Sequence, residues 1–252
     1  MTRRLIVNAD DLGRSRGIND GIFEAHARGV VSSATLMVGF EAAVDAAERL
    51  ARHPALGVGL HVTLTGSRPT LPVAEVPSLV DAAGRLPRKP EQIDGFRPEE
   101  ILAEVRHQLL RFRELTGRLP THLDSHHHSH RDPAVLEALI AVASESDLPV
   151  RRSSEAIAAR LAAAGVATTT AFSERFFGPD ATVDRFLEIL DEAPEGTLEI
   201  MCHPGYPDER LRAESGYADE RRAEIDVLTD PEVRDAVRAR FVLGTFGDGC
   251  AR

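Results

Sequence analysis

The chain has 252 residues, of which 42% are hydrophobic and 28% charged, and its formal net charge is −10. A single α/β barrel commonly has this length, so we expect one domain over residues 1–252. An acidic chain without a basic stripe has little to offset phosphate charge, which argues against nucleic acid and anionic membranes as main partners. Short basic runs, such as Arg151-Arg152 and Arg221-Arg222, are then interpreted as solvated surface.

The cysteine content and the first residues give no indication of export. Cys202 and Cys250 are the only cysteines in the sequence, too few for a disulfide framework. The first apolar run ends at Val7 and is followed by two aspartates, so it is too short for a signal peptide. No apolar run in the sequence approaches the length of a membrane span. We therefore predict a cytoplasmic protein without a membrane span.

The first part of the chain alternates short apolar runs with helical patterns. An apolar run predicts a buried strand over 5–7, and apolar residues at helical spacing predict a helix over 18–25. Apolar and β-branched residues then predict a strand over 30–38, an Ala-rich segment predicts a helix over 42–51, and a third strand is expected over 56–64.

The middle of the chain begins with a long irregular segment. Many prolines and glycines over 65–96 predict a loop, and a loop of this length in a compact domain is commonly functional. A long amphipathic pattern then predicts a helix over 98–116, which Gly117 ends. The next strand is expected over 121–125.

The rest of the chain continues the alternation. Asp132, followed by proline, is a helix start signal and predicts a helix over 134–144. Further strands are expected over 149–151, 198–202 and 241–243. Strands that alternate with helices predict a mainly parallel sheet, in which reactive groups gather at the carboxyl ends of the strands. The sequence therefore predicts an α/β fold of the barrel type.

Polar residues with metal-binding or acid–base chemistry follow four of the predicted strands. Asp10 and Asp11 come after the first strand, His61 lies in the third, and His126 and His203 end two later strands. Because such strand ends meet at one edge of a parallel sheet, we expect these five side chains to lie close together.

Each of these groups also has an ordinary structural interpretation. The paired aspartates 10–11 can cap the helix that follows them. His61 or His203 alone can be a hydrogen-bonded core histidine. Five of the ten histidines lie within 122–130, and such a cluster can be an incidental chelating tract. All five strand-end residues together are harder to explain in this way than any one of them.

The residue types indicate a catalytic metal centre. Asp11, His61 and His126 would offer one carboxylate and two imidazoles, leaving positions open for water and substrate. On strand alternation His122, Asp124 and His126 share one face, so that Asp124 can support a ligand. The carboxylate beside the ligand would stay free to take a proton from water activated by the cation.

Four segments resemble the signature blocks of the YdjC-like carbohydrate deacetylases. They are LIVNADDLGRSRGINDGI, GLHVTLTG, PTHLDSHHHSH and EIMCHPGY, which run from residue 5 to residue 206, and DVLTDPEV also fits. The resemblance implies a distorted (β/α) barrel related to polysaccharide deacetylases, and a substrate that is an N-acetylated sugar such as diacetylchitobiose. It also makes a homodimer an expectation.

The resemblance assigns roles residue by residue. It implies that Asp11, His61 and His126 hold one divalent metal ion, that Asp10 is the general base, and that His203 is the candidate general acid. Two imidazoles favour Zn²⁺, while the family also permits Mg²⁺. The segments 65–96 and 176–178 are expected to shape the sugar pocket.

Two points stay open at this stage. Asp124 is expected to orient His203 or His126, since ligand imidazoles commonly donate their second N–H to a carboxylate. The function has three alternatives: hydrolysis of another acetamide such as a glycolipid precursor, a mononuclear iron oxygenase with the same two-histidine, one-carboxylate set, and a metal-binding module built on the histidine cluster.

Overall fold

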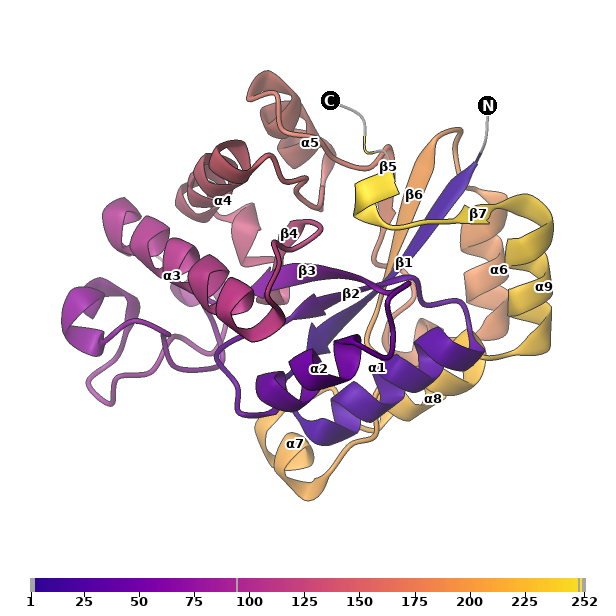
Figure 1. The fold of residues 1–252 in the computed structure, drawn as a ribbon, viewed down its shortest axis with the longest axis horizontal. Helices are drawn as coiled ribbons and strands as arrows, with labels where there is room; N and C mark the ends of the chain where they lie inside the picture. Colours follow the sequence, from indigo (N-terminus) through magenta and orange to yellow (C-terminus); the bar gives the residue numbers. More distant parts are fainter. Residues whose placement is uncertain (1–2, 94, 249, 251–252) are drawn as a thin grey trace.

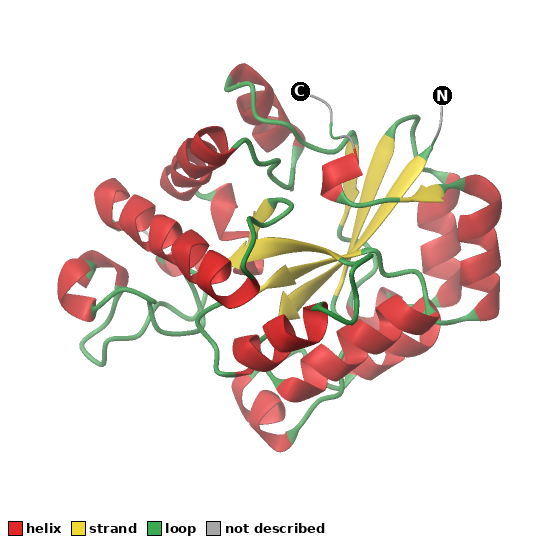
Figure 2. Cartoon of the chain, viewed as in Figure 1, coloured by secondary structure: helices red, strands yellow, loops and turns green. Residues whose placement is uncertain are grey.

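The computed structural model describes residues 3–93, 95–248 and 250. Strands alternate with helices through most of the chain (Figures 1 and 2). The strands are β1 (Arg4–Leu12), β2 (Ser33–Leu36), β3 (Gly57–Val62), β4 (Leu123–Ser125), β5 (Ala171–Ser173), β6 (Thr197–Cys202) and β7 (Val242–Leu243). The helices are α1 (Arg16–Arg28), α2 (Ala42–Leu50), α3 (Pro98–Thr116), α4 (Pro133–Ser146), α5 (Glu155–Ala163), α6 (Val183–Asp191), α7 (Glu209–Glu214), α8 (Glu220–Leu228) and α9 (Pro231–Arg240).

The strands form one curled parallel sheet. Their order is β4-β3-β2-β1-β6-β5, with β7 paired to β1 outside this path, and all the pairings are parallel. Figure 1 shows the strands as a fan at the centre, with α3, α4 and α5 along one side and α6 and α9 on the other. The predicted α/β fold with mainly parallel strands is confirmed.

Local signals in the sequence set several helix ends. Ser15 accepts a hydrogen bond from the backbone of Ile18 and caps α1, and Asp132 caps α4 just before Pro133, as predicted. Gly117 ends α3 with φ +70°, a left-handed conformation that glycine adopts without steric cost. These caps fix where each crossover turns back to the sheet.

Several predicted elements differ in the structure. The first strand is longer than expected and runs through both aspartates to Leu12. The strand expected over 149–151 is reduced to a single bridge between Leu123 and Val150. The loop over 65–96 contains three short 3-10 turns, η1 (Val73–Glu75), η2 (Pro77–Leu79) and η3 (Pro90–Gln92).

The sequence interpretation also missed elements in the second half of the chain. Helices α5 to α9 and strand β5 were not predicted. Strand β5 has only three residues, and the amphipathic helices there are short, so neither gives a long periodic signal.

The amino-terminal end of the sheet is closed by the last part of the chain. Strand β7 pairs with the start of β1, and the turn η6 (Phe246–Asp248) follows it. The Phe246 ring stacks on the buried His122 imidazole with centroids 3.6 Å apart. Gly59 lies against the same imidazole, and a side chain there would clash because its Cβ would come within 2.4 Å of the ring. The opposite, carboxyl end of the sheet is where the candidate site lies.

Candidate metal centre and active site

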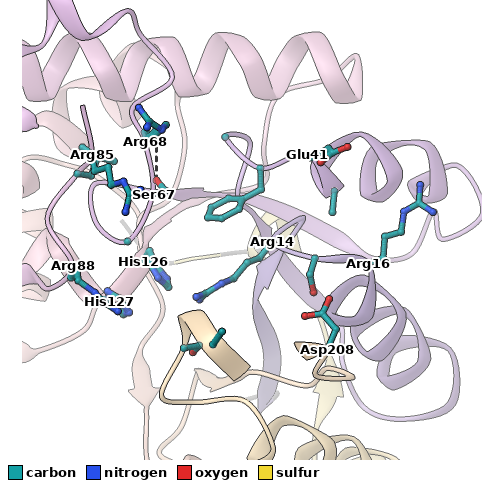
Figure 3. Close-up of a pocket in the computed structure, with 18 of the residues that line it drawn as sticks. Arg14, Arg16, Glu41, Ser67, Arg68, Arg85, Arg88, His126, His127 and Asp208 are labelled. Atoms are coloured by element: carbon teal, nitrogen blue, oxygen red, sulfur yellow. Dashed lines mark hydrogen bonds between the residues drawn. The ribbon is translucent and has the colours of Figure 1, made fainter. Parts of the chain in front are cut away.

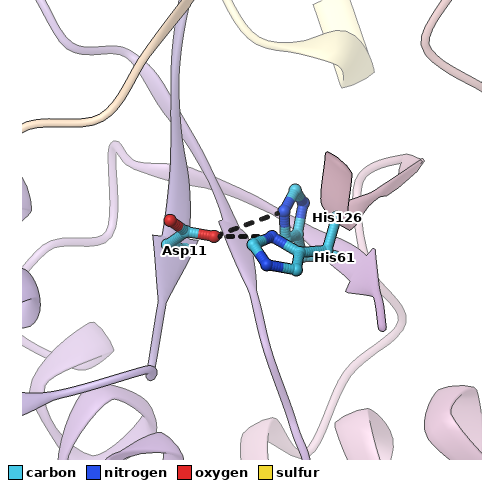
Figure 4. Close-up of side chains that lie close together, drawn as sticks. All are labelled: Asp11, His61 and His126. Carbon is cyan, nitrogen blue, oxygen red and sulfur yellow. Dashed lines mark ion pairs between the residues drawn. The ribbon is translucent and has the colours of Figure 1, made fainter. Parts of the chain in front are cut away.

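Three side chains from the ends of β1, β3 and β4 converge at the carboxyl end of the sheet. Asp11 Oδ1 lies 3.1 Å from His126 Nδ1 and 3.5 Å from His61 Nε2 (Figure 4). All three residues are buried, and their ligand atoms lie within 4.8 Å of one another. The structure therefore brings together the three residues that the sequence suggested as metal ligands.

The Asp11 backbone adopts a conformation that is uncommon for a residue with a side chain. Its φ is +71°, and the pairing of β1 with β2 shifts register between Ala9 and Leu12. Aspartate tolerates the left-handed region better than most residues, but the conformation still costs free energy. Regular alternation would send two consecutive carboxylates to opposite faces of the sheet, whereas with this irregularity Asp10 and Asp11 both line the same pocket.

A buried oxygen without a hydrogen-bond partner supports a metal ion between Asp11, His61 and His126. Asp11 Oδ1 is buried and accepts no well-directed hydrogen bond from the residues that the structure describes. The other oxygen, Oδ2, accepts a hydrogen bond of 2.5 Å from Arg221. A buried carboxylate oxygen without a hydrogen-bond partner is costly, and this one faces two imidazole nitrogens. The three atoms therefore suit the binding of a cation between them.

Asp124 supports one of these imidazoles. Its Oδ1 lies 2.7 Å from His61 Nδ1, and its Oδ2 accepts a hydrogen bond from Thr35 at 3.1 Å. The expectation that Asp124 orients His126 or His203 was wrong, because β3 and β4 pair in a register that sets His61 directly beside Asp124. Burial lowers the pKa of His61, but the Asp124 carboxylate outweighs it and raises that pKa. With Nδ1 held by Asp124, His61 presents Nε2 to the centre.

Asp10 lies in a buried network around Arg151. Two guanidinium nitrogens donate to its two carboxylate oxygens at 2.7 Å each, and Asn8 donates to Oδ1 at 2.7 Å. Arg151 also contacts Asp124 at 2.8 Å and Glu199 at 2.7 Å. Burial alone would raise the pKa of Asp10, but the Arg151 guanidinium outweighs it and holds that pKa well below its usual range.

The interpretation of Arg151 and Arg221 as solvated surface was wrong. Arg151 is fully buried and Arg221 is 2% exposed. Each is buried because carboxylates from distant parts of the chain surround it, Asp10 around Arg151 and Asp11 around Arg221. No local signal in the sequence indicates this burial, since the paired residues are separated by 141 and 210 positions.

His203 follows β6 on the other side of the site. Its backbone N–H donates to Glu224, and its Nδ1 lies 3.9 Å from Glu224 Oε1. Burial and the Arg221 charge lower the pKa of His203 to about 3, although Asp10 acts in the opposite direction. The imidazole is therefore neutral at pH 7 and stays neutral well below the pH at which an ordinary histidine gains its proton.

Two further histidines of the cluster have unusual backbone conformations. His127 and His128 follow each other with φ of +54° and +51°. The His127 ring stacks on the His126 ring with centroids 3.8 Å apart. His128 Nε2 lies 3.0 Å from Glu174 Oε2. Strained backbone of this kind concentrates at functional sites, so both are candidates for contact with substrate that the sequence interpretation did not single out.

The candidate metal centre opens into a large cleft. In Figure 3, His126 and His127 lie between Arg88 of the 65–96 segment and Arg14, which comes just before α1. Arg68 and Arg85 of the same segment lie on the Arg88 side. An adjoining pocket of about 550 Å³ contains the centre itself. Its lining residues include Asp10, Asp11, His61, His126, Phe177 and His203.

The fold has clear counterparts among solved structures. A family 4 carbohydrate esterase from Streptomyces lividans, solved in complex with acetate, superposes with a TM-score of 0.54 at 10% identity, covering 99% of this chain and 96% of that one. Identity this low shows the shared fold only. The chain thus shares with this esterase the fold of a curled parallel sheet flanked by helices.

Sequence comparison gives the family. A family model described as YdjC-like protein matches residues 4–239, so the chain belongs to the YdjC-like family. A carbohydrate deacetylase from Geobacillus stearothermophilus is 45% identical over 92% of this chain and 91% of its own length. A chitooligosaccharide deacetylase from Serratia marcescens is 40% identical over 98% of this chain and all of its own length.

One relative has a solved structure with the same architecture. A protein from Enterococcus faecalis V583, provisionally described as a cellobiose-phosphate cleavage protein, is 34% identical and superposes with a TM-score of 0.92 over 98% of each chain. The curated relatives confirm both the family and the predicted class of enzyme, a carbohydrate deacetylase. No helix in the described part of the chain has the length and apolarity needed to cross a membrane.

Proposed function

We propose that this protein is a metal-dependent hydrolase that removes N-acetyl groups from small amino sugars of the chitooligosaccharide type. The observation that carries the proposal is the uncapped Asp11 Oδ1 facing His61 and His126. Asp11, His61 and His126 would hold a divalent cation, which would supply Lewis-acid chemistry toward water and the acetamide carbonyl. The ligand set suits Zn²⁺, and Mg²⁺ with additional waters is the alternative.

The remaining roles follow from the side chains around the centre. Asp10 is the general base that takes a proton as water adds to the acetamide carbon, and Arg151 holds its carboxylate in place. His203 is neutral at rest, so it must first take up the proton that Asp10 removes from water. It then passes that proton to the leaving nitrogen, and the C–N bond breaks to give acetate and a free amine. Asp124 keeps the His61 ring in its orientation.

A group of cations at the mouth of the cleft favours a more specific substrate. Arg68, Arg85, Arg88 and Lys89 line one side of it in a chain whose net charge is −10. Such a group suits an anionic substituent on the sugar, such as a phosphate. The name of the Enterococcus faecalis relative refers to a sugar phosphate. A glycolipid precursor with an acetamide would also present an anionic group here.

The proposal is tested by acetate release from diacetylchitobiose. Metal-stripped protein is assayed with Mg²⁺, Zn²⁺ or Co²⁺ added back, beside His126→Ala. Release that the metal restores and the variant lacks supports the proposal. No release with any metal, from either the neutral or the phosphorylated disaccharide, contradicts it. Oxygen uptake with Fe²⁺ would indicate the iron oxygenase instead, and several metals bound per chain would indicate a metal-binding module.

Three general features also stay predictions. They are that residues 1–252 form one deacetylase domain, that the protein is cytoplasmic, and that it forms a homodimer. The unpaired state of Cys202 and Cys250 supports the second.

A further inference from the structure

Phe177 presents an aromatic ring at the edge of the candidate site that the roles above do not use. Its side chain is 44% exposed, whereas the neighbouring Phe176 is fully buried against Phe186. Phe177 lines the same pocket as the metal centre, and its ring centroid lies 5.4 Å from that of His203. Since Phe176 already fills the core position, core packing does not account for an aromatic ring at residue 177.

The ring of Phe177 rests on a second ring that is fixed in place. It stacks on Tyr217 with centroids 4.2 Å apart and an interplanar angle of 12°. The Tyr217 hydroxyl donates to Glu224 and accepts a hydrogen bond of 3.1 Å from the backbone of Gly178. Tyr217 therefore covers one face of Phe177 and holds it from behind, and the exposed surface of Phe177 lies away from Tyr217.

We propose that Phe177, backed by Tyr217, is the platform on which the sugar ring carrying the acetamido group stacks. The inference rests on the proposed function. A pyranose has a face of C–H groups, which packs on the negative face of an aromatic ring. The nitrogen that receives a proton from His203 is one C–N bond, about 1.45 Å, from the sugar ring. A substrate whose nitrogen meets His203 thus brings its ring to the neighbouring Phe177.

The position of both rings agrees with a substrate contact. Phe177 follows β5 and Tyr217 precedes α8, so the platform is built from two loops at the carboxyl end of the sheet. Preorganised side chains bind at a lower entropic cost than mobile ones. The hydrogen bonds of Tyr217 supply this preorganisation.

The first test is steady-state kinetics of Phe177→Ala with N-acetylglucosamine and diacetylchitobiose. Loss of the stacked ring is expected to raise KM roughly tenfold for both sugars with kcat nearly unchanged, because stacking binds ground and transition states alike. Phe177→Tyr should retain the wild-type KM. Leu119→Ala is the matched control, since Leu119 is also 44% exposed but lies in the turn before β4. An unchanged KM for Phe177→Ala overturns the platform.

The second test measures binding without turnover. The chain has no tryptophan, so Phe177→Trp adds a single fluorophore at the platform. When the full-length variant is titrated with N-acetylglucosamine, its tryptophan emission should change and reach a plateau, with or without added metal. The ring-free compound N-acetylethanolamine should leave the emission unchanged. Emission that responds equally to both compounds, or to neither, overturns the platform. A saturable response to the sugar without acetate release would leave the platform standing and contradict the proposed hydrolysis.

Discussion

Replacement of Arg151 by lysine tests the buried network most directly. The guanidinium contacts Asp10 twice, Asp124 and Glu199, all at 2.7–2.8 Å. Lysine keeps the positive charge but has three donors on one nitrogen, so it cannot reach carboxylates arranged around a planar fork. At least two charge-assisted contacts are lost, and each is worth about 1.5–3 kcal/mol. We therefore expect Arg151→Lys to lower the free energy of unfolding by about 3–5 kcal/mol.

The assay is urea denaturation at pH 7, with Arg152→Lys as the control. Arg152 is the next residue; it carries an ion pair to the almost fully exposed Glu155 and donates to the backbone oxygen of Thr170 at 2.5 Å, a neutral acceptor that lysine can also reach. A pair of that kind contributes about 1 kcal/mol or less. The two conservative changes should thus differ by several kcal/mol although they are adjacent. A loss below about 1 kcal/mol for Arg151→Lys would show that this guanidinium does not hold three buried carboxylates.

Three further predictions concern the centre and the closed end of the sheet. Asp124→Asn should weaken metal affinity about 10- to 100-fold by calorimetry, because His61 loses its charged partner; unchanged affinity contradicts that support. Asp10→Asn should bind metal normally but lose about 100-fold or more in kcat, and near-normal turnover would exclude Asp10 as the base. Burial lowers the pKa of His122 to about 3, so below pH 6.5 the unfolded chain binds one more proton than the folded chain. The free energy of unfolding therefore decreases as the pH is lowered below 6.5. His122→Phe, which keeps a ring against Phe246, should reduce that fall by about 1.4 kcal/mol per pH unit between pH 6 and 4, and an identical pH profile would contradict it.

The sequence could group the candidate metal ligands because parallel strands end at a common edge. Asp11, His61 and His126 could be grouped without any knowledge of strand order, since only their place at strand ends was needed. The partner of Asp124 could not be derived in this way. It depends on β3 pairing with β4 in the register that joins His61 to Asp124, and parallel pairing of residues 63 positions apart leaves no local pattern.

The buried arginines were missed for a related physical reason. A charged side chain is buried without a large cost only where the fold brings opposite charges to it. Burial of Arg151 or Arg221 therefore depends on the folded arrangement and not on the local sequence. The paired basic residues 151–152 and 221–222 look alike in the sequence, yet only the first of each pair is buried. Arg151 lies outside the helices and strands and Arg221 lies in the nine-residue α8, so neither belongs to a long periodic pattern that would reveal its burial.

These two arginines also separate the roles of the adjacent aspartates. Arg221 occupies one oxygen of Asp11 and leaves the other for a cation, whereas Arg151 and Asn8 occupy both oxygens of Asp10. The same contacts keep Asp10 ionised but make it a weak base, as its lowered pKa indicates. A weak base can take a proton only from water that is itself acidified, and a bound cation lowers the pKa of water to about 7. The proposed base therefore depends on the proposed metal, so loss of the metal would leave Asp10 without water acidic enough to deprotonate.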